Sequence, residues 1–392
     1  MYSKEIVLGI PKEIMEGEKR VAAIPSTCKK YVEMGIKVLV EKAAGEGAFL
    51  KDEEYRIAGA EIIDDVEALY DRANVILKVK EPLYNQGKNK HEIDMMKENT
   101  VLISFLHPAA PTNREMVKRI RDKKIISFTM DSIPRITRAQ KMDALTSMST
   151  VAGYKSAIMA ANYFPKFIPM TMTAIGMIQP AKFLIIGTGI VGLQAIATAK
   201  RLGGVVSAVD IRPDAREQAA SLGAKVVGFD VPPDLAIGEG GYAKALPEEW
   251  LEREKEALAP LVKESDIVIS AALVPGERAP VFITREMIEG MKRGSVICDV
   301  AIDQGGNCSL TQHGKQIWEH DVLISGIANI PGRMPGDSTW LYANNISNFL
   351  DSLIKAKELK IDQEDEIVKK VLVTIDGKIV HQGTLKAMEG VK

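Results

Sequence analysis

A glycine-rich turn follows an apolar run near the middle of the chain. The run Phe183–Ile186 leads directly into Gly187-Thr188-Gly189-Ile190-Val191-Gly192, which has the GxGxxG spacing of dinucleotide-binding turns. In such a turn Gly187 permits a tight bend, Gly189 lets the backbone approach a pyrophosphate, and Gly192 lets the following helix pack closely on the strand. The first N–H groups of that helix would then face the phosphates. The spacing predicts a phosphate-binding turn, although glycines also make ordinary strand-to-helix connections.

An acidic residue ends the next apolar run. Val205–Val209 is followed by Asp210, eighteen residues after Gly192. An acid at this place accepts hydrogen bonds from the adenosine ribose and repels a 2′-phosphate, which favours NAD(H) over NADP(H). Arg212, two residues further on, could instead accommodate a phosphate. The alternative is a structural turn with a solvated acid, but the turn and the acid together favour a dinucleotide site.

Two polar loops are candidates for covering that site. Pro134–Asp143 carries arginine, glutamine and lysine side chains near a predicted crossing between domains, where clefts commonly form. It could equally be a helix N-terminus with solvated charges. Gly238–Lys244 is glycine-rich and suits a flap whose Tyr242 closes on a ligand and excludes water. Taken alone, a surface loop with a half-buried tyrosine explains it as well.

Short β-branched runs alternate with helical patterns along most of the chain. This alternation is typical of βαβ units and parallel sheets. In the first series we predict strands at Ile6–Ile10, Lys37–Glu41, Asn74–Lys80, Thr100–Leu106 and Ile125–Asp131, with helices at Ser26–Met34, Asp52–Ala58 and Asn113–Asp122. In the second series we predict strands at Phe183–Ile186, Val205–Asp210, Lys225–Val227, Ile267–Ala271, Ser295–Val300 and Val322–Ile327. The predicted fold class is α/β, with two Rossmann-like, doubly wound parallel-sheet domains and a cleft between them.

The two domains are connected twice. The chain would leave the first domain after Ile133-Pro134-Arg135, along a helix from about Lys141 to Tyr163, and return through the proline- and glycine-rich segment 330–336. A helix capped by Asp337 or Ser338 and a hairpin around Asp376-Gly377 would follow. We therefore predict a discontinuous first domain of residues 1–140 plus 331–392, and an NAD(H)-binding domain of residues 141–330.

Composition excludes several classes of protein. The 392 residues are 46% hydrophobic and 26% charged, as in an ordinary globular protein, and the net charge of -1 offers no field for nucleic acid. Three separated cysteines predict neither a disulfide framework nor a zinc site, and favour a reducing compartment such as the cytoplasm. The scattered histidines predict no metal site. We expect neither a signal peptide nor a membrane-spanning helix, because the longest uncharged apolar stretch, 183–199, contains glycines and polar residues.

These motifs together carry a family resemblance. The chain resembles the NAD(H)-binding part of the alpha subunit of proton-translocating NAD(P) transhydrogenase, within the alanine dehydrogenase and transhydrogenase superfamily. The resemblance covers nearly the whole chain, through Gly9–Glu13, Glu18–Pro25, Gly153-Tyr154, the Gly187 turn, Val274-Pro275-Gly276, Ala279-Pro280, Gly305-Gly306-Asn307-Cys308 and Glu364–Val368.

Two loops pull the resemblance toward transhydrogenase. Arg135–Asp143 is similar to that family's Arg–Gln–Asp loop, which implies that Arg135, Gln140 and Asp143 surround the nicotinamide and its ribose. The loop with Tyr242 resembles the one that folds over bound NAD(H). A serine often lies three residues after the aspartate, where this chain has Thr146 and keeps the hydroxyl. The implied cofactor-binding residues are Gln140, Lys141, Met142, Asp143, Gly187, Gly189, Ile190, Val191, Gly192, Asp210, Ile211, Arg212, Gly241, Tyr242 and Leu273.

The resemblance also implies a reaction and partners. A hydride would pass directly from NADH bound here to NADP+ bound on a partner subunit, so the reacting carbon needs no acid or base. With one fingerprint and no membrane span, the NADP(H)-binding subunit and the membrane-embedded proton-translocating subunits would be separate chains. A homodimer is expected, placed at the inner face of the cell membrane through its partners.

Alanine dehydrogenase is the competing hypothesis. That enzyme needs a carboxylate clamp and a general acid/base besides NADH. The segments around Arg20, Lys80, His107, Asp303 and Asn329 resemble those that supply its substrate-binding and catalytic residues. Each residue alone has a structural explanation, so the set is either a working amino-acid site or a remnant. A nucleotide sensor without catalysis would need only the fingerprint and leaves this set unexplained.

Overall fold

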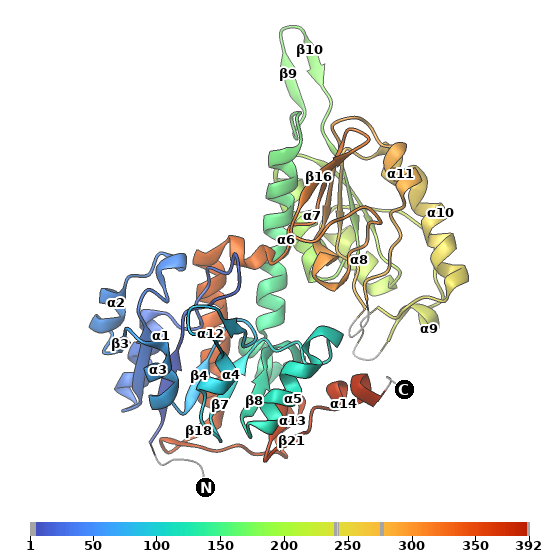
Figure 1. Ribbon diagram of the computed structural model, residues 1–392. Helices are drawn as coiled ribbons and strands as arrows, with labels where there is room; N and C mark the ends of the chain where they lie inside the picture. Colours follow the sequence, from blue (N-terminus) through green and yellow to red (C-terminus); the bar gives the residue numbers. More distant parts are fainter. Residues whose placement is uncertain (1–4, 239–240, 242, 275–277, 390–392) are drawn as a thin grey trace. The chain divides into compact units, whose positions relative to one another are not determined.

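The computed structural model describes residues 5–238, 241, 243–274 and 278–389 (Figure 1). The chain forms two compact units. Unit 1 comprises Met1–Met148 and Gly332–Lys392, and unit 2 comprises Ser149–Pro331. The long helix α6 (Ala144–Tyr163) begins in unit 1 and continues into unit 2.

Unit 1 is built on an eight-stranded sheet with the order β21-β20-β8-β7-β4-β1-β2-β3. Its strands are β1 (Val7–Ile10), β2 (Lys37–Glu41), β3 (Glu61–Ile63), β4 (Val75–Leu77), β7 (Val101–Ser104), β8 (Ile126–Thr129), β20 (Leu372–Ile375) and β21 (Lys378–Ile379). The first six are parallel, and β20 joins β8 antiparallel. The C-terminal segment therefore returns to the first sheet, as the sequence predicts.

Helices and small hairpins complete unit 1. They are α1 (Pro25–Glu33), α2 (Asp52–Ile57), α3 (Val66–Arg72), α4 (Glu92–Met95), α5 (Arg114–Asp122), α12 (Pro335–Leu353), α13 (Glu366–Val371) and α14 (Gln382–Glu389), with the strand pairs β5 (Tyr84–Asn85)/β6 (Lys90–His91) and β18 (Ile354–Lys355)/β19 (Glu358–Leu359). Short 3₁₀ turns are η1 (Glu46–Ala48), η2 (Pro111–Asn113), η3 (Met130–Ser132), η4 (Thr137–Met142) and η7 (Ile330–Arg333), of which η7 spans the boundary between the units.

Unit 2 has a seven-stranded sheet with the order β13-β12-β11-β14-β15-β17-β16. Its strands are β11 (Lys182–Ile186), β12 (Val205–Val209), β13 (Lys225–Val226), β14 (Ile267–Ser270), β15 (Val296–Asp299), β16 (Gln316–Glu319) and β17 (Val322–Ser325), of which only β16 is antiparallel. Besides α6, its helices are α7 (Ile190–Arg201), α8 (Pro213–Ser221), α9 (Pro233–Ala236), α10 (Glu248–Glu264) and α11 (Arg285–Glu289), with the 3₁₀ turn η6 (Val300–Gln304) and a hairpin of β9 (Thr171–Thr173) and β10 (Gly176–Ile178).

Strand β11 lies in the centre of this sheet and is covered on both faces. Phe183 and Ile185 pack in one core cluster with residues of α6 and α7. Leu184 and Ile186, which point to the other face, pack with residues of α10 and α11. A parallel strand buried on both sides is apolar at every position, which explains the continuous run in the sequence.

The predicted α/β class with parallel-sheet domains is confirmed. The helix expected to be capped by Asp337 or Ser338 instead begins at Pro335, because proline is well suited to the first helical position. The strand predicted over Asn74–Lys80 ends at Leu77. Within the described residues, no helix is long and apolar enough to cross a membrane.

Candidate functional site

The glycine turn between β11 and α7 has the backbone that its spacing predicts. Gly187 has φ +86°, and a Cβ placed there would lie 2.8–2.9 Å from backbone atoms of Ala271 and Ala272. A Cβ at Gly192 would lie 2.0 Å from the carbonyl oxygen of Gly187. Only glycine satisfies both contacts, so the turn and the helix it starts are held against the end of β14.

Gly189 differs from the other two glycines because it faces open space. It is the N-cap residue of α7, and a Cβ placed there would meet nothing within 4 Å. No side chain caps this helix, so the N–H groups of Ile190 and Val191 point out of the first turn without a capping acceptor. Uncapped N–H groups and the positive end of the helix dipole make this turn suitable for an anion such as a pyrophosphate.

A second helix supports the turn from behind. At Gly153, in α6, a Cβ would lie 2.2 Å from the carbonyl oxygen of Val191. The backbones of α6 and α7 therefore touch at this glycine. The close approach fixes the first turn of α7, on which the geometry of an anion site would depend.

Asp210 lies directly after β12, is 7% exposed, and uses both carboxylate oxygens. Oδ2 accepts hydrogen bonds from the Thr188 N–H at 2.7 Å and the Thr188 hydroxyl at 3.1 Å. Oδ1 accepts from the Arg212 N–H at 2.9 Å. Burial raises the pKa of Asp210, but the hydrogen bonds and charge of Arg212 outweigh burial and hold the pKa below its usual value. The acid is thus ionised and can accept hydrogen bonds from hydroxyl groups.

Arg212 forms a two-pronged ion pair with Asp210. Its Nε lies 3.0 Å from Oδ1 and its Nη2 lies 2.9 Å from Oδ2. The third nitrogen, Nη1, donates to the carbonyl oxygen of Gly241 at 3.2 Å. The half-buried Ile211 between them accepts a bond from Arg216 through its carbonyl oxygen. Asp210, Ile211, Arg212 and Gly241 are thus brought to one place, whereas Tyr242 lies outside the described residues.

The end of β14 is fixed by polar residues that the sequence did not single out as site residues. Asn307 donates to the Ala272 carbonyl oxygen at 2.9 Å and accepts from the Ala272 N–H at 3.1 Å. Buried Asp299 in turn accepts the Asn307 N–H at 2.9 Å. These bonds position Leu273, which follows Ala272. Asn307 lies within the Gly305–Cys308 motif, and Thr188 lies inside the glycine fingerprint, so proximity to motifs was the available signal.

The polar loop before α6 has a mixed structure within unit 1. It forms the 3₁₀ turn η4, with Met142 buried and Arg135, Gln140 and Lys141 exposed. Asp143 acts as the cap of α6, because its carboxylate accepts the Thr146 N–H at 2.8 Å and the Thr146 hydroxyl at 2.6 Å. The helix-terminus interpretation therefore describes Asp143 correctly, and it leaves the exposed side chains of the loop available for another role.

Two contacts tie this loop to the C-terminal segment of unit 1. Arg138 pairs with both carboxylate oxygens of Asp365, at 2.7 and 3.1 Å, and Asp365 also caps α13. Asn345 of α12 donates to the Lys141 carbonyl oxygen at 2.9 Å. The acidic Glu364–Val368 motif thus has a structural task, which is to hold the loop.

The residues of the alanine dehydrogenase hypothesis fall in both units. In unit 1, the His107 ring pairs with Asp131 at 2.6 Å, and the His107 backbone is left-handed with φ +44°. Burial lowers the pKa of His107, but the Asp131 carboxylate outweighs it and raises the pKa above its usual value. Arg20 is buried and pairs with Glu18 at 2.6 Å. In unit 2, Asp303 accepts the Asn329 N–H at 3.3 Å.

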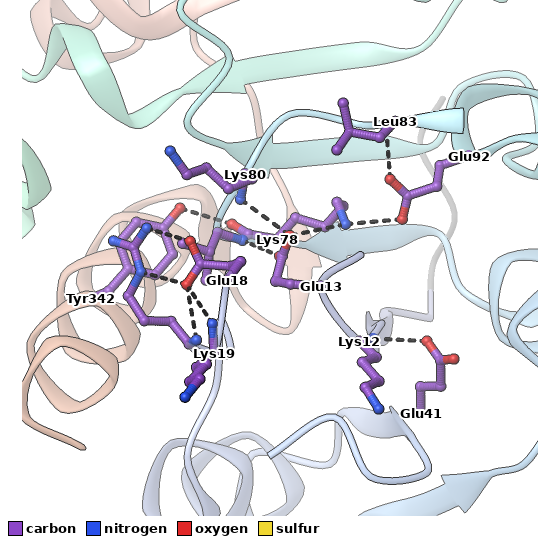
Figure 2. A network of polar contacts seen from close by, with 12 residues as sticks. Lys12, Glu13, Glu18, Lys19, Glu41, Lys78, Lys80, Leu83, Glu92 and Tyr342 are labelled. Carbon is purple, nitrogen blue, oxygen red and sulfur yellow. Dashed lines mark hydrogen bonds and ion pairs between the residues drawn. The ribbon is translucent and has the colours of Figure 1, made fainter. Parts of the chain in front are cut away.

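A buried charged cluster occupies the carboxyl ends of β1 and β4 in unit 1 (Figure 2). The Lys78 ammonium lies 3.2 Å from Glu13 and 2.9 Å from Glu92, and all three side chains are at most 3% exposed. Glu13 also accepts the Val79 N–H at 2.6 Å, and Tyr342 donates to the Lys78 carbonyl oxygen at 2.8 Å. Burial raises the pKa of Glu13 to about 7 despite the opposing effect of Lys78. Across the described part of the chain, no group of acids, histidines and cysteines is arranged to hold a metal ion.

Comparison with known proteins decides the family. The family model for the alanine dehydrogenase/PNT N-terminal domain matches residues 9–152, and that for the alanine dehydrogenase/PNT C-terminal domain matches residues 156–382. The chain belongs to the alanine dehydrogenase/PNT family. The resemblance stated from the sequence is thereby confirmed.

Individual members of the family differ in their similarity to this chain. The first of the chains that make up the NAD(P) transhydrogenase alpha subunit of Rhodospirillum rubrum is 43% identical over 377 residues, which is 95% of this chain and 97% of that protein. The alanine dehydrogenase of Methanococcus maripaludis is 32% identical over 391 residues, 97% of this chain and 96% of that protein. A solved structure of transhydrogenase from Sinorhizobium meliloti is 39% identical, with a TM-score of 0.83 over 96% of this chain and all of that chain.

Proposed function

We propose that this chain is the NAD(H)-binding subunit of a proton-translocating NAD(P) transhydrogenase. The observation that carries the proposal is the turn around Gly189, open toward solvent at an uncapped helix start, with the ionised Asp210 at the end of the next strand. These residues fit a dinucleotide: the α7 N–H groups suit its pyrophosphate, and the carboxylate suits its adenosine ribose. The higher identity to the transhydrogenase subunit than to the alanine dehydrogenase supports the same choice.

When bound, NADH supplies a hydride from C4 of its dihydronicotinamide. The chain's own residues bind and orient the cofactor, and they exclude water while the hydride moves. In this proposal Gln140 and Asp143 orient the ring and its ribose, and Arg135 holds the carboxamide. Lys141, Met142, Ile211 and Leu273 line the remainder of the cofactor, and Tyr242 closes over it.

The proposal requires further chains. NADP(H) would be held by a partner subunit, and membrane-embedded subunits would couple the hydride transfer to proton movement. The chain would then lie at the inner face of the cell membrane through these partners. The support for separate partners is that the R. rubrum relative, which this chain matches over nearly its full length, is itself named as one portion of an alpha subunit.

The direct test is one assay with NADH in two mixtures. The first contains an NADP(H)-binding partner subunit and an NADP+ analogue, and the second contains pyruvate and ammonium. We expect turnover in the first mixture and none in the second, measured by the absorbance of the reduced nucleotide. Turnover in the second mixture with none in the first would overturn the proposal in favour of alanine dehydrogenase.

One observation favours that second candidate, alanine dehydrogenase acting through Lys80, His107 and Asp303. His107 keeps a left-handed backbone, which costs a non-glycine residue free energy, and Asp131 fixes its ring. Such strain is often kept at functional sites. In this candidate Arg20 would bind the substrate carboxylate while it remains beside Glu18. The variant His107→Gln should abolish any pyruvate-dependent turnover but leave the partner-dependent turnover unchanged.

We further infer that the chain forms a homodimer through the β9–β10 hairpin. The hairpin extends from unit 2 and exposes Met170, Met172, Ile175 and Met177, of which Ile175 is 99% exposed (Figure 1). Adjacent exposed apolar side chains on a protruding element are typical of a protein interface.

The dimer has a simple test by sedimentation. The double variant Met172→Asp, Ile175→Asp should shift the chain from dimer to monomer at micromolar concentration, because each charge would have to be buried. Trp318→Ser removes an equally exposed apolar side chain elsewhere in unit 2 and should leave the dimer intact. A monomeric wild type, or a dimer that survives the double substitution, would contradict the inference.

A further inference from the structure

The carboxylate of Asp210 has no acceptor position to spare. An ionised carboxylate offers about four lone-pair sites on two oxygens. In this chain it accepts five hydrogen bonds: two from Thr188, one from the Arg212 backbone and two from the Arg212 guanidinium. A ribose hydroxyl can therefore bind Asp210 only if one of the present donors leaves.

The five donors differ in how easily they can leave. The Thr188 and Arg212 N–H groups belong to the glycine turn and to the residue before α8, so moving them would disturb the backbone. The guanidinium is at the end of a flexible side chain that is 13% exposed. It is the donor with the lowest cost of release, since its charge regains water when it moves outward.

Release of the guanidinium frees the number of positions that a ribose needs. Nε occupies one site on Oδ1, and Nη2 occupies one site on Oδ2. Their departure leaves one acceptor on each oxygen, which matches the 2′- and 3′-hydroxyl groups of one ribose. The backbone N–H bonds remain and keep the carboxylate in place.

We propose that Arg212 is an intramolecular competitor for the adenosine ribose, which must displace its guanidinium from Asp210 before the cofactor is held. The same displacement breaks the bond from Nη1 to the Gly241 carbonyl oxygen, so arrival of the ribose releases the 238–244 loop from this anchor. Arg212 thereby lowers the affinity for the cofactor and links its binding to the loop. This inference rests on the proposed function, since it presupposes that NAD(H) binds at Asp210.

The sign of the change in affinity tests the inference. Arg212→Met keeps the length of the side chain and removes the fork, so NADH should bind about three- to tenfold more tightly, as expected for loss of one competing ion pair. Arg212→Lys keeps the charge without the fork and should give a smaller gain. Arg216→Met is the matched control: it removes an arginine of α8 that pairs with Asp230 instead, and should leave the affinity unchanged.

A pair of nucleotide probes separates competition from a structural effect. Isothermal titration calorimetry of 5′-AMP should show the same gain in Arg212→Met, whereas 2′,3′-dideoxy-AMP, which has no hydroxyl for Asp210, should bind both proteins equally. Weaker NADH binding in Arg212→Met, or equal changes for both probes, would overturn the inference and leave the proposed function standing. A wild-type chain that binds neither NADH nor AMP would overturn both.

Discussion

The two sheets share a strand order and differ at the place where ligands bind in such sheets. In unit 1 the parallel strands run β3-β2-β1-β4-β7-β8, and in unit 2 they run β13-β12-β11-β14-β15-β17. Both orders reverse direction beside the first strand, between β1 and β4 in one unit and between β11 and β14 in the other. Ligands of open α/β sheets bind outside the carboxyl ends of the strands at this reversal.

The two reversals are filled differently. In unit 2 the chain leaves β11 through glycines, which keep the backbone close to β14 and leave Gly189 facing open space. In unit 1 the chain leaves β1 toward Glu13, whose carboxylate meets Lys78 at the end of β4. Side chains and charge thus occupy in unit 1 the position that the glycine turn leaves open in unit 2 (Figure 2). Strand order alone therefore does not make a nucleotide site, and the residues of the first turn decide.

The largest expected effect is on the stability of unit 1. Lys78→Met leaves Glu13 and Glu92 buried without their cation, and breaking a buried pair in this way costs about 3–5 kcal/mol. Urea unfolding should show a loss of this size, while NADH affinity stays within about twofold of the wild type. Lys80→Met, at a half-buried position two residues away, serves as the control. Equal losses in both variants would show that the cluster has no special structural role.

The next effect concerns the open glycine of unit 2. Gly189 has φ −69°, which alanine adopts without strain, so Gly189→Ala should fold normally. Its methyl group would point into the space proposed for the pyrophosphate, and NADH binding should weaken about 100-fold, or roughly 2.7 kcal/mol. The matched control is Gly336→Ala, since Gly336 lies in the first turn of α12 and also faces open space. Unchanged affinity in Gly189→Ala would remove the turn from the account.

The smallest effect separates two buried acids by their response to pH. Burial and the nearby Asp210 raise the pKa of Glu254, in α10, to about 7. The folded state therefore holds this proton more tightly than the unfolded state, so stability falls as pH rises from about 4.5 to 7 and then levels off. Glu254→Gln should match the wild type at pH 5 and exceed it by about 1–2 kcal/mol at pH 8.

Urea unfolding midpoints at the two pH values measure this difference. The control Glu256→Gln changes an exposed acid of the same helix and should follow the wild type at both values. The pH dependence contributed by Glu13 in unit 1 should persist in Glu254→Gln, because that acid has its own partner in Lys78. A Glu254→Gln chain that is no more stable at pH 8 would contradict the assignment.

Local sequence patterns were sufficient for the elements that position the cofactor site. The strand and helix on either side of Gly187 follow from a continuous apolar run and a glycine spacing, both of which act within a few residues. The return of the C-terminal segment also followed from a local signal, the hairpin at Asp376-Gly377. Its pairing with β8 confirmed that prediction.

Contacts between distant residues were beyond the reach of these patterns. Nothing local indicates that Lys78 and Glu92 meet Glu13, or that Asn307 fixes Ala272, since their partners are brought together only by the folded sheets. The fork between Arg212 and Asp210 spans only two residues, yet either residue alone was expected to bind a cofactor. The sequence therefore predicted the residues at this place without their competition.

The most direct test is a crystal structure of the chain with NADH. The account predicts the pyrophosphate against the N–H groups at Gly189 and the start of α7, and ribose hydroxyls on Asp210. It also predicts no nucleotide at the carboxyl ends of β1 and β4, where the Lys78 cluster lies. A nucleotide bound at that end of the unit 1 sheet, with the Gly189 turn empty, would contradict the account.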